Sequence, residues 1–463
     1  MTLDSVFFIG CFLPMSLLLH WLMPGIRTKN GLLLVVSLVF YAFSGLAALP
    51  VLAVGILIAW AAGVLLRKGK AKKWVLAVAV AIDLALLAVF KYADFLLTQV
   101  LGLQEASLSL AAPLGISYFL FKCIAYKVDV YRDEKQAGGF LEVALFVSFF
   151  PQITMGPITR FSEFLPQLKS RELTLETTAK GIRRFVVGLA KRLVISAPLG
   201  IVVDQVFATA LPDARLAWLG AVCYCLQLYF DFSGFIDMVI GLGTMLGFTT
   251  RENFDHPYMA ASIGDFWRRW HMSLSGWFKD YLYIPLGGNR KGSLRAGLNK
   301  SIVFILCGLW HGANWTFLLW GIWHGVLSLL ESLQIIPTKK MAASRGGRVV
   351  GHIYALLAVC LGFVMFRAAN VSQGFAMLGA MFAGFSFTDG GTVLLHSLLN
   401  GQTLVMLALG VVLSLPVGTW LQRIPKAEKW LEPASFVLTV ALFVLCLLRL
   451  ASGNFAPSIY AQF

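Results

Sequence analysis

Apolar runs of helix length recur along this chain, and they constrain its fold more than any other feature. Each is close to the ~20 residues that an α-helix needs to cross a bilayer. The runs are continuous rather than alternating, which favours a helical bundle over a β-barrel. They lie near residues 5–23, 31–47, 50–66, 74–91, 194–209, 216–248, 299–317, 316–334, 350–367, 402–419 and 434–450.

Composition supports this assignment. Hydrophobic residues make up 58% of the chain and charged residues only 13%, which excludes an ordinary soluble domain. We therefore predict an all-α integral membrane protein, a polytopic bundle of about 11–13 membrane-embedded helices. No cleavage signature follows the first run, so residues 1–23 are expected to remain as a first span.

The net charge of +15 comes from lysines and arginines in short loops between the apolar runs. The positive-inside rule accounts for this pattern without a nucleic-acid partner, and none is expected. It predicts that the loops holding Arg27 and residues 67–73 are cytoplasmic and that the N-terminus is outside. Contact between some cations and an anionic substrate such as coenzyme A stays open.

Two segments depart from simple spans. Glycine and proline interrupt residues 113–160, and broken backbone at membrane depth requires surrounding protein or a water-filled cavity. We predict re-entrant or funnel-lining structure there. Residues 174–192 carry an apolar and a basic face, which predicts an amphipathic helix at the cytoplasmic interface.

The first polar island is DFWRRWHMSLSGWFKDYLYIPLGGNR, residues 265–290. In a helix, Asp265 and Arg269 would be spaced to pair, and Trp267 would lie one turn before His271. Arg268 and Arg269 fit the phosphates of a nucleotide carrier. Snorkelling or pairing with Asp265 explains the two arginines equally well.

The second island, CGLWHGANW (residues 307–315), holds His311 between two glycines inside an apolar run. A histidine titrates near neutrality, so we favour His311 as a general base over a core histidine bonded to a backbone carbonyl. His271, 311 − 271 = 40 residues upstream, would orient the acceptor or stabilise developing charge. Its alternative is an interfacial packing residue. For His324, a role in packing and a role in assisting His311 both stay open.

Other polar residues receive more modest roles. Trp267, Trp270 and Trp310 would shape a dry pocket, and Asn314 is a candidate substrate-binding residue. Two carboxylates inside an apolar run are expected to pair with arginine or to cap a broken helix; they are Asp231 and Asp237. The sequence has no phosphate-binding loop, nucleophile elbow or zinc pattern, so we expect no metal and no bound cofactor.

Seven strings, in order, resemble the membrane-bound O-acyltransferase superfamily. The nearest branch is the alginate O-acetyltransferase type, with teichoic-acid D-alanylation proteins more distant. The N-terminal spans agree in character only. The strings are LGISYFLFKCIAYKVDVYR (114–132), FPQITMGPITRF (150–161), YFDFSGFIDMVIG (229–241), DFWRRWHMSLSGWFKDYLYIPLGGN (265–289), GLWHGANWTFLLWGIWHG (308–325), VMFRAANV (364–371) and SIYAQF (458–463).

The resemblance implies a helical bundle around a funnel, with His311 at the catalytic position and His271 at the second active-site position. It implies a single transmembrane domain over residues 1–463: N-terminal spans to 110, a catalytic core at 111–334 and C-terminal spans from 335. Lys122 and Lys127 depart from the family string, where uncharged residues are expected.

Such a protein would be a multi-pass acetyltransferase of the bacterial cytoplasmic membrane. The resemblance implies acetyl-CoA as donor and an SGNH-hydrolase-like extracytoplasmic protein as partner. It also implies a polysaccharide synthesis and secretion complex, with alginate or cellulose as the polymer. The rival function is a transporter or channel component of a polysaccharide export complex. Secondary transporters show matching broken helices in two halves, whereas the polar islands here crowd into one segment.

Overall fold

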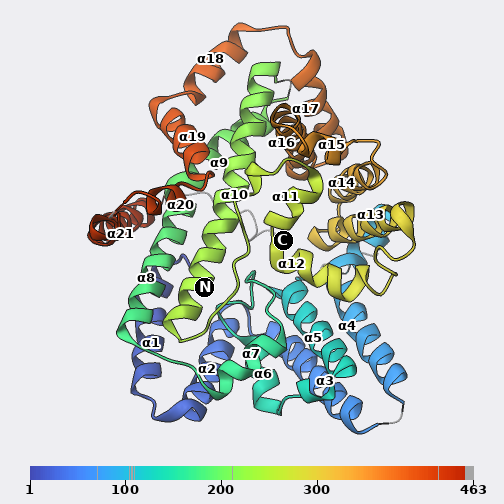
Figure 1. Cartoon of the computed structure of the whole chain (residues 1–463), viewed down its shortest axis with the longest axis vertical. Helices are drawn as coiled ribbons and strands as arrows, with labels where there is room; N and C mark the ends of the chain where they lie inside the picture. Colours follow the sequence, from blue (N-terminus) through green and yellow to red (C-terminus); the bar gives the residue numbers. More distant parts are fainter. Residues whose placement is uncertain are drawn as a thin grey trace. The chain divides into compact units, whose positions relative to one another are not determined.

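A computed structural model describes residues 1–69, 71–103, 105, 108, 110–210, 212–425 and 427–453. All regular structure in these ranges is helical (Figure 1), and the predicted all-α class is confirmed. The C-terminal string, residues 458–463, lies outside the described residues, as does the end of the predicted C-terminal part.

The chain divides into two compact units. One consists of Met1–Phe185 and Ile236–Arg251, and the other of Val186–Phe235 and the chain from Glu252 onward. Two helices, α8 (Leu175–Ala190) and α10 (Ala214–Met245), contribute residues to both units. The three-part division into residues 1–110, 111–334 and 335–463 stays a prediction.

The first unit is built around α5, most of whose side chains are buried. Gly115 starts α5 in the left-handed conformation (φ 71°), and a Cβ there would lie 2.1 Å from the Ile153 carbonyl oxygen, so only glycine fits. The helices and short helical turns of this unit are η1 (Phe8–Phe12), α1 (Leu13–Leu22), α2 (Gly25–Ala42), α3 (Ala48–Lys68), α4 (Lys72–Phe95), η2 (Leu96–Val100), α5 (Ile116–Arg132), η4 (Glu134–Gln136), α6 (Phe140–Ser148) and α7 (Phe161–Lys169).

The interrupted segment is more regular than its glycines and prolines suggested. Residues 116–132 and 140–148 are helical, and the break near its end is confined to residues 149–160. Protein groups bind this buried irregular segment: Phe150 N donates to Ser37 Oγ at 3.0 Å, and Lys122 Nζ donates to the side-chain Oε1 of Gln152 at 3.0 Å. The first contact satisfies a backbone donor, as non-helical backbone at membrane depth requires. A re-entrant path stays a prediction.

The second unit contains both polar islands. Its core includes a tight hairpin of α13 and α14, in which a Cβ on Gly308 would lie 2.3 Å from the Phe317 carbonyl oxygen. Its elements are η5 (Lys191–Ser196), α9 (Ala197–Ala208), η6 (Pro257–Met259), α11 (Ile263–Arg269), α12 (Met272–Phe278), η7 (Lys279–Tyr283), α13 (Gly292–His311), α14 (Trp315–Ser332), α15 (Thr338–Ala342), α16 (Arg345–Arg367), α17 (Val371–Ala383), α18 (Asp389–Leu398), α19 (Gly401–Leu413), α20 (Val417–Gln422) and α21 (Glu428–Ala451).

Six helical runs within the described ranges are long and apolar enough to cross a membrane, and the pair α18 and α19, bent by 65°, would make a seventh. The remaining predicted runs also form helices, such as α1 and α14, that are shorter or more polar. The protein is therefore a multi-pass membrane protein. The six runs are Ala48–Arg67, Lys72–Val100, Leu175–Ala208, Ala214–Met245, Arg345–Arg367 and Lys429–Ala451.

The amphipathic segment at 174–192 is not separate from the span predicted near 194–209. The two form one continuous helical run, Leu175–Ala208, and the position of its first part at the membrane interface stays a prediction. Two arginines of its basic face contact buried carboxylates on α10. Arg184 contacts Asp237 at 2.5 Å, and Arg192 Nε contacts Asp231 at 3.1 Å. These contacts also confirm the predicted pairing of both aspartates with arginine.

Candidate functional site

His311 is the last residue of α13 and is only 7% exposed. Aromatic rings from three helices surround its imidazole. The ring centroids of Trp310, Trp320 and Phe366 lie 5.0, 5.3 and 5.0 Å from that of His311. The residue predicted as the base is therefore buried among aromatic rings, a setting in which electrostatic interactions are stronger than in water.

His271 lies at a sharp turn between α11 and α12. Trp270 is extended, and His271 has a left-handed backbone (φ 46°, ψ 53°) before α12 begins. Trp267 and His271 are thus not one turn apart on a single helix, as predicted from their spacing. The turn has a tertiary cause, because Met272 N donates to the Asn253 carbonyl oxygen at 3.0 Å.

The His271 side chain is 2% exposed. Its ring meets Phe232 edge to face, with centroids 4.7 Å apart, and its Nδ1 lies 3.1 Å from Asn253 Nδ2. Its Nε2 is buried and has no hydrogen-bond partner among the described residues. Burial lowers the pKa of His271 to about 3, so the ring is neutral at physiological pH.

The structure brings the two predicted histidines into contact with the same indole ring. The Trp310 ring centroid lies 6.3 Å from that of His271 and 5.0 Å from that of His311. Ring contacts continue from His311 through Trp320 to His324, whose centroid is 5.1 Å from that of Trp320. His324 is therefore one aromatic ring further from His311. The site is a buried cluster of ring contacts that includes all three histidines.

Two of the predicted tryptophans contact these histidines directly. Trp310 contacts His271 and His311, while Trp267 Nε1 donates to His324 Nδ1 at 3.4 Å. Trp270 stacks on Phe266 at 5.4 Å. The expectation that these tryptophans shape a substrate pocket stays a prediction.

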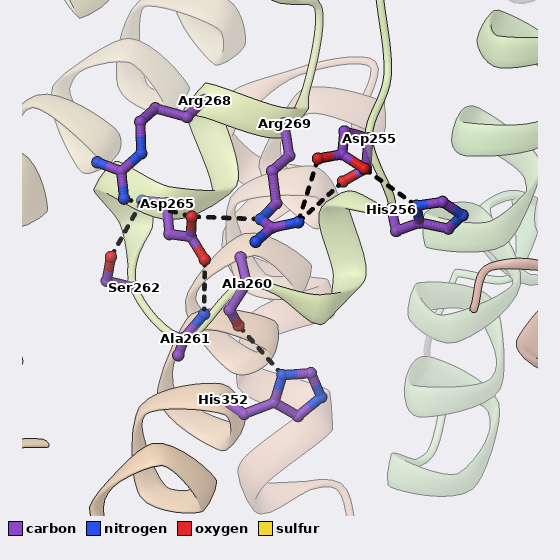
Figure 2. A network of polar contacts seen from close by, with 9 residues as sticks. All are labelled: Asp255, His256, Ala260, Ala261, Ser262, Asp265, Arg268, Arg269 and His352. Atoms are coloured by element: carbon purple, nitrogen blue, oxygen red, sulfur yellow. Dashed lines mark hydrogen bonds and ion pairs between the residues drawn. The ribbon is translucent and has the colours of Figure 1, made fainter. Parts of the chain in front are cut away.

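Arg269 is held by two carboxylates (Figure 2). Its Nε donates to Asp265 at 3.2 Å, and its Nη1 lies 3.4 Å from Asp255 Oδ2. The predicted Asp265–Arg269 pair is confirmed. Asp255 N also donates to the Arg269 carbonyl oxygen at 2.9 Å, so Arg269 joins the loop after α10 to the end of α11.

Arg268 differs from its neighbour. Its side chain is 72% exposed, and its Nη2 lies 3.3 Å from Asp265 Oδ1, a surface ion pair that stabilises little. Of the two arginines it is the more available to an anionic ligand, and phosphate binding stays a prediction for both. Asn314 caps α14, accepting from Thr316 N at 3.1 Å, and donates to the Ala369 carbonyl oxygen at 3.2 Å.

Sequence reasoning missed several residues that contact the predicted histidines, Phe232 beside His271 among them. Trp320 and Phe366 pack on His311, and Asn253 contacts His271. Trp320 lies in the same apolar helix that follows the second island, so its aromatic character was visible. Asn253 and Phe366 lie 18 and 55 residues from their partners, and no local pattern signals those contacts.

The geometry offers two buried imidazoles for proton transfer and hydrogen bonding. Within the described part of the chain, no group of three or more His, Cys, Asp or Glu side chains is placed to hold a metal ion. Metal-free chemistry stays a prediction.

Comparison with known proteins bears directly on this site. The model of the MBOAT, membrane-bound O-acyltransferase family, matches residues 73–369, which include every predicted site residue. The chain is 37% identical to the probable alginate O-acetylase AlgI of Pseudomonas putida, over the whole of both chains. It is 34% identical to the peptidoglycan O-acetyltransferase of Helicobacter pylori, over 82% of this chain and 79% of that protein. A teichoic acid D-alanyltransferase of Bacillus subtilis is 28% identical, over 55% and 68% respectively.

Proposed function

The chain belongs to the membrane-bound O-acyltransferase family, and we propose that it passes an acetyl group from cytoplasmic acetyl-CoA across the membrane. The acetyl group serves the O-acetylation of an extracytoplasmic polysaccharide such as alginate or cellulose. The names of its relatives support this chemistry, since they include alginate and peptidoglycan O-acetyltransferases. The observation that carries the proposal is that His271 and His311, 40 residues apart in the sequence, are both buried and both contact the Trp310 ring.

In this mechanism His311 is the general base. It takes the proton from the acceptor hydroxyl as the hydroxyl oxygen attacks the thioester carbonyl. The tetrahedral intermediate then collapses, the C–S bond breaks, and the protonated His311 returns its proton to the leaving thiolate of coenzyme A. The products are the O-acetyl ester and free coenzyme A. The rings of Trp320 and Phe366 around His311 would keep out water, which would otherwise hydrolyse the thioester.

His271 would assist at the carbonyl. Negative charge develops on the thioester oxygen in the transition state, and a preorganised hydrogen-bond donor there lowers the barrier. The buried Nε2 of His271 is the candidate donor. The neighbouring Arg268, which is largely exposed, would contact phosphate groups of the donor.

The proposal places the protein in the bacterial cytoplasmic membrane with its donor on the cytoplasmic side. Only the acyl group crosses; coenzyme A and the polymer stay on their own sides. An SGNH-hydrolase-like protein outside the membrane would receive the acetyl group and place it on the polymer, within a polysaccharide synthesis and secretion complex.

A sidedness experiment tests the proposal. The purified chain is reconstituted in vesicles with radiolabelled acetyl-CoA sealed inside and with the partner protein and polymer outside. Label should appear on the polymer while labelled coenzyme A stays in the lumen. Acetylation that occurs only with acetyl-CoA outside would contradict the proposed direction. Passage of intact acetyl-CoA would favour the rival transporter.

A further inference from the structure

We infer that Asn253 is a positioning residue that fixes His271 as the tautomer protonated on Nε2. His271 would then act as a hydrogen-bond donor to the reacting carbonyl oxygen and not as the base. The catalytic part of this inference rests on the proposed function, but the tautomer itself can be measured without any activity.

Asn253 is fully buried in the loop between α10 and η6. Both of its acceptor oxygens bind the backbone that follows His271. Its carbonyl oxygen accepts from Met272 N at 3.0 Å, and its side-chain Oδ1 accepts from Ser273 N at 2.8 Å. The Asp255–Arg269 contacts shown in Figure 2 hold the same loop two residues further on. The loop is therefore tied to the turn that carries His271.

The Ser273 bond decides which way the Asn253 amide faces. A backbone N–H can only donate, so the group 2.8 Å from Ser273 N must be the amide oxygen. The opposite orientation would set the amide NH₂ against another donor. The NH₂ group therefore faces His271: Nδ2 lies 3.1 Å from the ring Nδ1, whereas Oδ1, which accepts from Ser273 N, lies 3.4 Å from it. The shorter contact pairs the amide donor with the ring nitrogen, so we infer that Nδ1 accepts.

The position of the proton on the ring follows. A neutral imidazole carries one N–H, and the nitrogen that accepts a hydrogen bond is the one without it. With Nδ1 accepting from Asn253, the proton lies on Nε2. That N–H is buried without a partner among the described residues. An unpaired buried donor is costly and calls for an explanation; the carbonyl oxygen of a bound thioester would supply its acceptor.

The strained backbone of His271 also supports a functional role for its side chain. Non-glycine residues rarely have positive φ, and such strain concentrates at functional sites. His271 has φ 46° and is held there by the Asn253 loop. The ring is thus placed by tertiary contacts and not by a helix. This division of labour leaves proton abstraction to His311.

The substitution Asn253→Asp tests the inference. A carboxylate is nearly isosteric with the amide and still accepts from Ser273 N, but it offers only acceptors to Nδ1. The ring proton should move to Nδ1, leaving Nε2 bare. Loss of one oxyanion donor typically lowers kcat by about 10²–10³-fold. We expect a fall in kcat of that size with little change in KM for acetyl-CoA.

The tautomer is read by ¹⁵N NMR of protein labelled on histidine nitrogens, with the His271 signals identified by their absence in His271→Gln. Wild-type protein should show a protonated Nε2 and an unprotonated Nδ1, and Asn253→Asp the reverse. A matched control is Asn299→Asp, because Asn299 is equally buried and its Nδ2 donates to the Gly288 carbonyl oxygen. The control should leave the His271 signals unchanged.

Two results would overturn the inference. One is a wild-type spectrum with the proton on Nδ1. The other is an Asn253→Asp protein in which loss of the Nε2 proton and loss of activity do not occur together. If the wild-type protein transfers no acyl group at all, the proposed function fails, while the spectrum still decides whether Asn253 sets the tautomer.

Discussion

His311 meets Trp320 edge to face, with ring centroids 5.3 Å apart and ring planes at 89°. The two residues come from the facing helices α13 and α14, and Trp320 is almost completely buried. A catalytic group is most effective when packing holds its side chain in one orientation on rigid elements. The contact therefore helps to hold the imidazole of His311 in one orientation, as the proposed proton transfer requires. It also allows the chemical role of the imidazole to be tested apart from the fold.

The substitution His311→Ala should abolish acyl transfer and leave the protein folded. Positioned proton transfer contributes about 10²–10⁴-fold to a rate, and we expect a loss of at least that size. The acetyl content of the polymer and the thermal unfolding of the purified protein measure the two effects. His396→Ala is the control, because His396 is exposed on α18. Normal acetylation by His311→Ala would remove His311 from the mechanism.

Two substitutions at His271 distinguish a role as hydrogen-bond donor from a role as general base. The glutamine side chain can present an N–H where Nε2 now lies, whereas an ionised glutamate can only accept. We expect His271→Gln to keep measurable activity and His271→Glu to lose it, with about a tenfold or larger difference in kcat. Initial rates with acetyl-CoA give the comparison, and unfolding temperatures show whether both variants fold. A more active glutamate variant would instead assign proton abstraction to His271.

Local patterns in the sequence predicted the helices and the charge pairs close to them. The apolar runs at 50–66 and 216–248 became α3 and α10, because a continuous run of this length has no other way to satisfy its backbone in lipid. Asp265 and Arg269 pair because a helix brings residues four apart to one face. Asp231 pairs with Arg192, because a buried carboxylate without a partner is energetically costly.

Contacts between distant segments could not be predicted in the same way. The turn at His271 depends on Asn253, whose carbonyl oxygen accepts from Met272 N. The prediction that Trp267 and His271 lie one turn apart assumed a continuous helix, and this long-range hydrogen bond stabilises a turn there instead. The packing of Phe366 on His311 joins α16 to α13 and depends on helix arrangement, which periodicity does not determine. The candidate histidines were thus visible in the sequence, but their orienting neighbours were not.

The orientation in the membrane provides a third prediction. The N-terminus should lie outside and the loop at 67–73 should be cytoplasmic, because the charge of alternate loops sets orientation. In a background without native cysteines, cysteine at Thr2 should react with a membrane-impermeant maleimide on intact spheroplasts. Cysteine at Ala71, an exposed residue of that loop, should react only after lysis. Labelling of the Ala71 position before lysis would overturn the orientation.

The buried ion pair between Lys127 on α5 and Asp83 on α4 provides the last prediction. Both side chains are 0% exposed, and Lys127 Nζ also donates to the Ala79 carbonyl oxygen at 2.9 Å. Removing one partner of a buried pair leaves an uncompensated charge and typically costs about 3–5 kcal/mol, whereas replacing both by apolar residues is often neutral or stabilising. Asp83→Asn should therefore lower the unfolding temperature markedly.

The double variant Asp83→Leu with Lys127→Met should recover most of that loss, since no charge remains to be desolvated. The matched control is the partly exposed pair of Lys72 and Glu134: Glu134→Gln should cost at most about 1 kcal/mol. Thermal unfolding of all four proteins in one detergent compares the effects. Adding the single variants Asp83→Leu and Lys127→Met completes the double-mutant cycle that isolates the coupling between the two residues. If Asp83→Asn is as stable as wild type, or the double variant is no better than the single one, the pair does not govern the packing of α4 on α5. If the predicted order of stability is observed, the ion pair explains how this chain accommodates a lysine at position 127. The charge of Lys127 is compensated by the carboxylate of Asp83 on the neighbouring helix.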